Sequence, residues 1–250
     1  RQIGADLGVD FVLEGAVRSE PGTGQQSRVR ITPQLIQVAD DTHLWADRYE
    51  RVKADIFAIQ SEVAENVVRA MGIQLLPREK TALAAASTNN MEAYDFYLRG
   101  LELASKSHGV KDQEGALRMF QTAVDRDAQF SLALAELAKA HLWLYFYFDR
   151  FHVPPDKAHV ESAGKVIESL SKIGENFPET RIARGYYTYW GLDKAEPALV
   201  EFRAALALQP SSIPALLGNL FMLRRLGRWD EAGEQVPKLF ELDPRNPEVL

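Results

Sequence analysis

Apolar side chains recur at helical spacing in the second half of the chain. Between residues 179 and 212 two stripes follow one another, first Ile182, Gly185, Tyr186 and Tyr189, then Ala198, Phe202 and Ala205. Spacings of three and four residues place such side chains on one face of a helix, and that face is buried. Pro210 cannot continue a helix, so it ends the second stripe. The segment predicts two short helices joined by a turn.

The pattern repeats along the chain at a spacing of 34 residues. Ala232 lies 34 residues after Ala198, and the alanine–phenylalanine–alanine spacing occurs earlier at Ala116, Phe120 and Ala123. One helix pair cannot bury its apolar face alone, so neighbouring pairs must stack. The chain is therefore predicted to form an all-α helical solenoid of about four repeats over residues 91–250.

These repeats resemble the tetratricopeptide repeat, a helix pair of 34 residues. The residues that match the family's fixed positions are Tyr189, Ala198, Phe202, Ala205 and Pro210. Ile182 stands where the family has Trp, and the sequence GRWDEA at 227–232 follows the family's turn. The resemblance implies stacked antiparallel helix pairs and a role in protein–protein interaction.

The repeat around residues 131–178 is expanded. Ala116 and Ala198 stand 82 residues apart, where two periods give 68. The surplus falls around residues 145–157, in a long first helix and a proline-containing loop. The run HLWLYFYFDRFH at 141–152 is apolar on all sides, so it needs cover. Two interpretations stay open: the loop folds back over the run, or the run is a partner or dimer surface.

Residues 1–77 have a different pattern, that of a partial mixed α+β domain. The predicted elements are strands at 10–18, 28–38 and 43–50 and an amphipathic helix at 55–71. Pro33 indicates an edge strand or a bulge, because proline cannot donate to a sheet ladder. Trp45 and Tyr49 alternate along the third strand, so both are expected in the core of this domain.

The boundaries of this domain follow from glycine and proline. Residues 1–7 are expected to be the end of a helix, with Gly8 as its C-cap. Pro77 is expected to end the helix at 55–71. Residues 78–90, REKTALAAASTNN, are predicted to be a linker.

The same region resembles the second half of the TolB amino-terminal-like domain. The motifs that carry the resemblance are LEGAVR at 13–18, QLI at 34–36 and HLWADRY at 43–49. In bacteria this domain commonly precedes tetratricopeptide repeats in multidomain signalling proteins, often behind a class III adenylate cyclase domain or a winged-helix DNA-binding domain. The resemblance covers residues 1 to about 72 and implies no catalytic residues.

Composition and motifs argue against chemistry within this chain. The net charge is −6 with no basic block, which disfavours nucleic-acid binding, and the absence of cysteine excludes disulfides and thiolate metal sites. Gly22-Thr23-Gly24 precedes a predicted strand rather than a helix, so a hairpin turn is favoured over a phosphate loop. The five histidines lack metal-ligand spacing, and His141 is expected in the core or at an interface. We expect no catalytic residue, cofactor or metal.

The first helices of stacked pairs line the concave face of a solenoid. The exposed stripe of these helices predicts a partner-binding groove made of Lys139, Trp143, Arg184, Tyr187, Trp190, Phe221, Arg224 and Arg225. Aromatic residues and arginines are enriched at binding hot spots, and arginines bind carboxylates with two hydrogen bonds. The expected partner is a protein or peptide of acidic character. The alternatives are that these residues are ordinary solvated surface, or that the loop at 148–157 covers them; a homodimer also remains open.

Together these patterns predict a non-catalytic interaction and regulatory module of a larger bacterial signalling protein. The alternatives are a fragment of a class III adenylate or guanylate cyclase, with its catalytic domain outside this chain, or of a winged-helix transcription regulator. The chain starts without Met, and residues 246–250 resemble the start of a fifth repeat, so we expect it to be cut from a longer protein. No apolar run is long enough to span a membrane. The expected compartment is the cytoplasm, or the periplasm if a membrane helix lies upstream.

Overall fold

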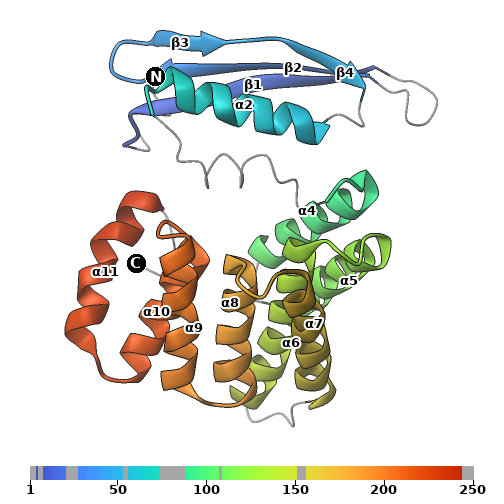
Figure 1. Ribbon diagram of the computed structural model, residues 1–250, viewed down its shortest axis with the longest axis vertical. Coiled ribbons are helices and arrows are strands. Elements are labelled where there is room, and N and C mark those ends of the chain that lie inside the picture. Colours follow the sequence, from blue (N-terminus) through green and yellow to red (C-terminus); the bar gives the residue numbers. More distant parts are fainter. Residues whose placement is uncertain are drawn as a thin grey trace. The chain divides into compact units, whose positions relative to one another are not determined.

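The computed structural model describes residues 4, 8–20, 28–52, 56–73, 88–106, 109–150 and 156–243, and it excludes the side chains of residues 19, 20, 149 and 150. The chain divides into two compact units, Arg1–Asn89 and Asn90–Leu250. The described strands all lie in the first unit, and the described part of the second unit consists of helices and their turns (Figure 1). The predicted fold class is confirmed: an α+β part precedes an all-α solenoid.

The sheet of the first unit is antiparallel and has β2 at its centre. Its strands are β1 (Phe11–Glu20), β2 (Arg28–Gln37), β3 (Thr42–Ala46) and β4 (Tyr49–Val52). β1 pairs with one edge of β2, and β3 and β4 pair in turn with the other edge. The prediction of one strand over residues 43–50 was therefore wrong, since the chain leaves the ladder at Asp47 and Arg48.

Pro33 explains where that ladder breaks. The amide of Asp47 donates to the carbonyl of Pro33 at 3.1 Å, so the polar atoms of Pro33 face the gap between β3 and β4. In an antiparallel sheet, the N–H and C=O groups of one residue point to the same neighbouring strand. The backbone N–H that proline lacks would therefore also have pointed into this gap, where no strand needs it. Of the two predicted possibilities for Pro33, the edge position was wrong, because its strand is central. An irregularity does occur nearby, since the pairing of β2 with β3 shifts register between Leu35 and Ile36.

One face of the sheet is covered by α2 (Ile56–Ala70), as Figure 1 shows. Val29, Tyr49 and Ile59 form the buried cluster between them, and Trp45 packs against it. The expectation that Trp45 and Tyr49 belong to this core is confirmed. The side-chain amide of Asn66 donates to the Tyr49 hydroxyl at 2.9 Å, which satisfies the polar end of the buried ring.

Glycine caps set the helix ends of this unit. Gly72 has φ +72°, and the Ile73 amide donates to the Val68 carbonyl at 3.1 Å, so α2 ends in a Schellman cap before Pro77. Gly8 has φ +65°, and the amide of Val9 donates the equivalent hydrogen bond to the carbonyl of Gly4. This agrees with the predicted role of Gly8 as a C-cap. The predictions for the turn at 22–24, for Pro77 and for most of the 78–90 linker lie outside the described residues.

The described part of the helical unit forms four consecutive antiparallel pairs (Figure 1). The pairs are α4 (Met91–Lys106) with α5 (Val110–Arg126), α6 (Ser131–Arg150) with α7 (Ala158–Gly174), α8 (Pro178–Tyr186) with α9 (Ala195–Leu208), and α10 (Ile213–Arg225) with α11 (Trp229–Leu242). A π-helical turn, η3 (Tyr187–Gly191), continues α8. We call α4, α6, α8 and α10 the A helices. The expected fifth repeat at 246–250 lies outside the described residues.

Phenylalanine packed against glycine brings the helices together. Phe202 of α9 is fully buried, and a Cβ atom on Gly185 of α8 would lie only 2.7 Å from its ring. A Cβ on Gly218 of α10 would lie closer still, so both A helices need glycine there. Phe120 meets Gly100 of α4 in the same way. Gly185, where the family pattern has leucine, therefore makes room for the repeat's own phenylalanine.

Candidate protein-interaction site

A hollow of about 330 Å³ lies across the A helices of the last three pairs and reaches α4. We call it the first hollow. Its lining residues are Tyr97, Leu132, Ala135, Glu136, Lys139, Pro178, Glu179, Ile182, Ala183, Tyr186, Gln209, Ser211, Ser212, Ile213 and Pro214. The set combines apolar and aromatic walls with a few polar groups, which is the usual makeup of a binding site.

The wall supplied by α8 is one face of a regular helix. Glu179, Ile182, Ala183 and Tyr186 follow the i, i+3, i+4, i+7 spacing and all line the first hollow. The Tyr186 ring meets the ring of Phe202 edge-on at a centroid distance of 5.1 Å. Because Phe202 belongs to the core, this contact gives the wall a fixed position.

Two carboxylates and one ammonium group face the first hollow. The Lys139 Nζ lies 2.7 Å from the Glu136 carboxylate, so this cation is paired within α6. The Glu179 carboxylate accepts a hydrogen bond from the Ser131 hydroxyl at 2.7 Å. Within the described ranges, no ion pair to Glu179 occurs. Burial first, and then the Glu136 charge with a smaller effect from Glu179, raise the pKa of Tyr97.

A second hollow of about 320 Å³ lies beside the C-terminal ends of the A helices α6 and α10. Its lining residues are Tyr145, Phe146, Tyr189, Trp190, Gly191, Asp193 and Arg225. The ring of Trp190 stacks on that of Phe146 at 5.6 Å and lies 4.4 Å from that of Tyr186, which lines the first hollow. The two hollows are therefore neighbours on the A-helix side.

Trp190 lies in the π-helical turn η3. A π turn inserts an extra residue into a helix and is frequent at functional sites. With ordinary helical spacing, Trp190 was grouped with Tyr187 on one stripe. Trp190 is also four residues after Tyr186, a spacing that places two side chains on one helical face, and their rings lie 4.4 Å apart. Tyr187 packs against the core cluster that contains Leu134 and Ile167. Sequence periodicity gives no signal for such a turn.

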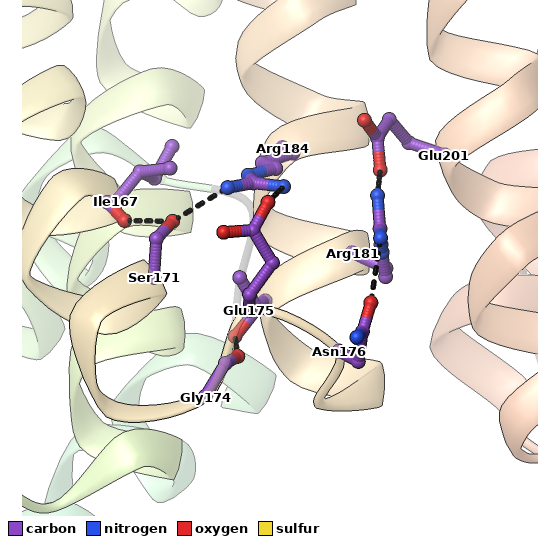
Figure 2. Close-up of polar contacts among 9 residues, drawn as sticks. Ile167, Ser171, Gly174, Glu175, Asn176, Arg181, Arg184 and Glu201 are labelled. Carbon is purple, nitrogen blue, oxygen red and sulfur yellow. Dashed lines mark hydrogen bonds and ion pairs between the residues drawn. The ribbon is translucent and has the colours of Figure 1, made fainter.

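Arg184 and Arg181 of α8 are used within the fold, as Figure 2 shows. Arg184 donates to the Glu175 carboxylate and to the Ser171 hydroxyl, both at 2.9 Å. Arg181 donates to Glu201 at 3.1 Å and to Asn176 at 2.7 Å. The Arg184 side chain is directed at α7 and its C-terminal end, and it lines neither hollow.

The predicted groove residues fall into three groups. Lys139 lines the first hollow, and Trp190 and Arg225 line the second. Trp143 stacks on Tyr147 at 4.9 Å and lines neither. Phe221 and Arg224 are exposed on α10, also outside both linings, while Arg184 and Tyr187 face α7 and the core.

Sequence reasoning missed the residues of the first hollow other than Lys139. Ile182 and Tyr186 had been assigned to the buried stripe, yet both are half-buried and border this hollow. Glu179 was not considered. The available signal was its position three residues before Ile182 on the same helical face.

The aromatic run of α6 is covered in part by the neighbouring repeat. Leu142 and Leu144 are buried, and Phe146 stacks on Trp190 of η3. The loop that was expected to fold back over the run falls mainly on residues 151–155, outside the described residues. His141 is half-buried, with its Nδ1 atom 2.8 Å from Nδ1 of His159 on α7. Burial, together with the charge of His159, lowers the pKa of His141 to about 4.

The described residues show neither a metal-binding cluster nor a membrane-spanning helix. They contain no group of three or more His, Asp or Glu side chains arranged to hold a metal ion. Among the helices described, none is both long enough and apolar enough to cross a bilayer.

No family model matches the chain. It is 33% identical over 138 residues to "Putative adenylate cyclase 3" of Rhizobium meliloti (strain 1021), a match that covers 55% of this chain and 22% of the relative. The chain thus spans about a fifth of the length of that relative.

Solved structures with similar helices include tetratricopeptide-repeat proteins. One is TTC0263, a thermophilic TPR protein of Thermus thermophilus, at 18% identity and a TM-score of 0.40, covering 63% of this chain and 94% of that one. Another is MamA of Desulfovibrio magneticus RS-1, at 16% identity and a TM-score of 0.37, covering 78% and 97%.

Proposed function

We propose that this chain is a non-catalytic protein–protein interaction module whose A-helix side binds a peptide segment of a partner. The observation that carries the proposal is the pair of adjoining hollows, of about 330 and 320 Å³, with aromatic walls from α6, α8 and η3. Glu179 and Trp190 lie eleven residues apart on α8 and η3, which is about 16 Å along a helix. An extended segment of about five residues spans that distance.

The residues of the second hollow favour an acidic group in the part of the partner segment that binds there. Arg225 lines it, Arg224 is its exposed neighbour, and neither forms an ion pair within the part of the chain that the structure describes. A guanidinium group can hold a carboxylate with two hydrogen bonds. Trp190 and Phe146 add an aromatic surface beside the arginine, and binding hot spots are enriched in both kinds of side chain.

The parent is proposed to be a multidomain bacterial signalling protein, with residues 1–77 as a partial TolB amino-terminal-like domain, residues 78–90 as linker and residues 91–250 as the repeats that regulate it. The similarity to part of a much longer protein named as an adenylate cyclase supports this candidate. A winged-helix transcription regulator is the second candidate, supported by the TolB-like motifs alone. The coding sequence upstream of Arg1 separates them, since cyclase domains carry metal-binding aspartates and winged helices carry a basic recognition helix.

The interaction role is tested with peptides selected from a random dodecapeptide phage library on the full 250-residue chain. Ser211→Trp places a bulky ring at the exposed loop that borders the first hollow, so it should abolish binding of the selected peptides. Ser169→Trp makes the same change on the exposed side of α7 and should leave binding unchanged. Circular dichroism checks that both variants keep their helices. Equal binding by both variants, or a library from which nothing is selected, overturns the proposal.

The proposal also states that this chain catalyses no nucleotide chemistry by itself. Purified chain incubated with ATP and Mg²⁺ or Mn²⁺ should form no cyclic AMP above a heat-denatured control. Product above that control would favour an enzymatic role for these residues.

A further inference from the structure

The charged groups without an ion pair among the described residues differ between the two hollows, and in the second hollow they are Arg225 and Asp193. On α8, Arg181 and Arg184 are held by Glu201 and Glu175 (Figure 2). In the first hollow Lys139 is held by Glu136. These cations are therefore already compensated, and none of them offers an uncompensated charge to a partner. What the first hollow still presents is a carboxylate.

That carboxylate belongs to Glu179. The Ser131 hydroxyl holds one of its oxygens at 2.7 Å, but a hydroxyl leaves the negative charge in place. Ile182 and Tyr186 lie one and two turns further along the same face, so an aliphatic stem can lie on them with a cation at Glu179.

We propose that the first hollow selects a partner segment with a lysine or arginine side chain, whose cation pairs with the Glu179 carboxylate. This inference rests on the proposed function, because it names the chemistry of the segment that the A-helix side binds. It also replaces, at this hollow, the acidic partner expected from sequence, which relied on Arg184. Charge complementarity of this kind sets which partner binds and in which orientation.

The test uses the dodecapeptides selected on the wild-type chain. Lysine or arginine should be enriched among them relative to the unselected library. The affinity of a synthetic selected peptide should fall roughly five- to tenfold on Glu179→Gln, which keeps an oxygen for the Ser131 hydroxyl. Glu234→Gln removes the same charge from the exposed side of α11, outside both linings, and should leave affinity unchanged.

A double-mutant cycle then assigns the pair. Replacing the peptide's lysine or arginine with glutamine should weaken binding to wild type by the same factor, with little further loss on Glu179→Gln. This inference is overturned if the peptides whose binding is lost on Ser211→Trp carry no lysine or arginine, or if their affinity is unchanged on Glu179→Gln. In either case the proposed function still stands. If the selected peptides bind Ser211→Trp with unchanged affinity, both the inference and the proposed function are overturned.

Discussion

The third and second helix pairs of the solenoid solve the same packing problem with different side chains. In the third pair, Phe202 of α9 fills the space left by Gly185 and Gly218 on the adjacent A helices. In α7 of the second pair, the residues with the same spacing are Ala163, Ile167 and Leu170, and Ile167 packs in a cluster with Ala138 of α6. A large ring thus packs against two glycines in the third pair, and a smaller side chain packs in a cluster with alanine in the second, so the repeat does not fix the size of this side chain.

The difference also shows where a binding surface arises. The regular third pair buries Phe202, while Tyr186 and Trp190 of the same pair line the two hollows. The expanded pair has the long helix α6, which runs to residue 150, and there Phe146 meets Trp190 and Tyr145 joins the wall of the second hollow. The second hollow thus lies where the long helix α6 meets η3.

The largest expected effect comes from removing the central ring of the regular pair. Phe202→Ala should lower the free energy of unfolding of the helical unit by about 3–5 kcal/mol, because it deletes a fully buried side chain and leaves a cavity between two glycines. Ile167→Ala in the expanded pair should cost nearer 2 kcal/mol. Denaturant titration followed by circular dichroism measures both. Equal losses would mean that the two pairs do not differ in how they pack.

A matched pair of glycine substitutions sharpens the same comparison. Gly218→Ala places a methyl group against the Phe202 ring and should destabilise by about 1–3 kcal/mol. Gly233→Ala lies in α11 with nothing within 4 Å of the new methyl group, so it should stabilise by about 0.5–1 kcal/mol. The opposite signs are the result to look for, since propensity alone makes both changes favourable. Stabilisation by Gly218→Ala would contradict the close contact.

Sequence patterns predicted most of the fold because burial follows periodicity. The hairpin of β1 and β2, helix α2 and all four helix pairs followed from spacings of two, three and four residues. The break between β3 and β4 was missed, because it depends on which edge of β2 the missing donor of Pro33 faces. The turn η3 was missed because Tyr187 to Gly191 carries no mark of a π turn.

The candidate site was predictable only in part, for a related reason. Periodicity shows which face of a helix is apolar, but not which residues of other helices oppose it. Arg184 looked available on its own helix, whereas Glu175 and Ser171 reach it from the preceding helix. Glu179 and Tyr186 line the first hollow because α6 and the start of α10 stand opposite them. Such pairings between repeats require the fold itself.

The histidine pair of the expanded repeat gives it a pH dependence that the regular pair lacks. The pKa of His141 is about 4 in the folded chain, below its usual 6.5. Between these two pH values the unfolded chain therefore binds a proton at this histidine and the folded chain does not. Stability should be constant above pH 6.5 and fall as the pH drops towards 4. The loss should be on the order of 1 kcal/mol, since the ring is only partly buried and water screens its charge. His141→Asn keeps a polar atom near Nδ1 and should flatten this part of the profile; an unchanged slope would assign it to other groups.

The smallest expected effect separates the charges used by the fold from those left for a partner. Arg184→Ala removes two hydrogen bonds, to Glu175 and Ser171, but the Glu175 side chain is 62% exposed and water can replace its partner. The cost should therefore be about 0.5–1 kcal/mol of unfolding free energy. The affinity for a selected peptide should stay within about twofold of wild type, because the Arg184 side chain lines neither hollow. Isothermal titration measures that affinity, and Glu179→Gln in the same assay provides the contrast. A large loss of binding on Arg184→Ala with intact helices would place the binding surface beside α7 instead of on the A-helix side.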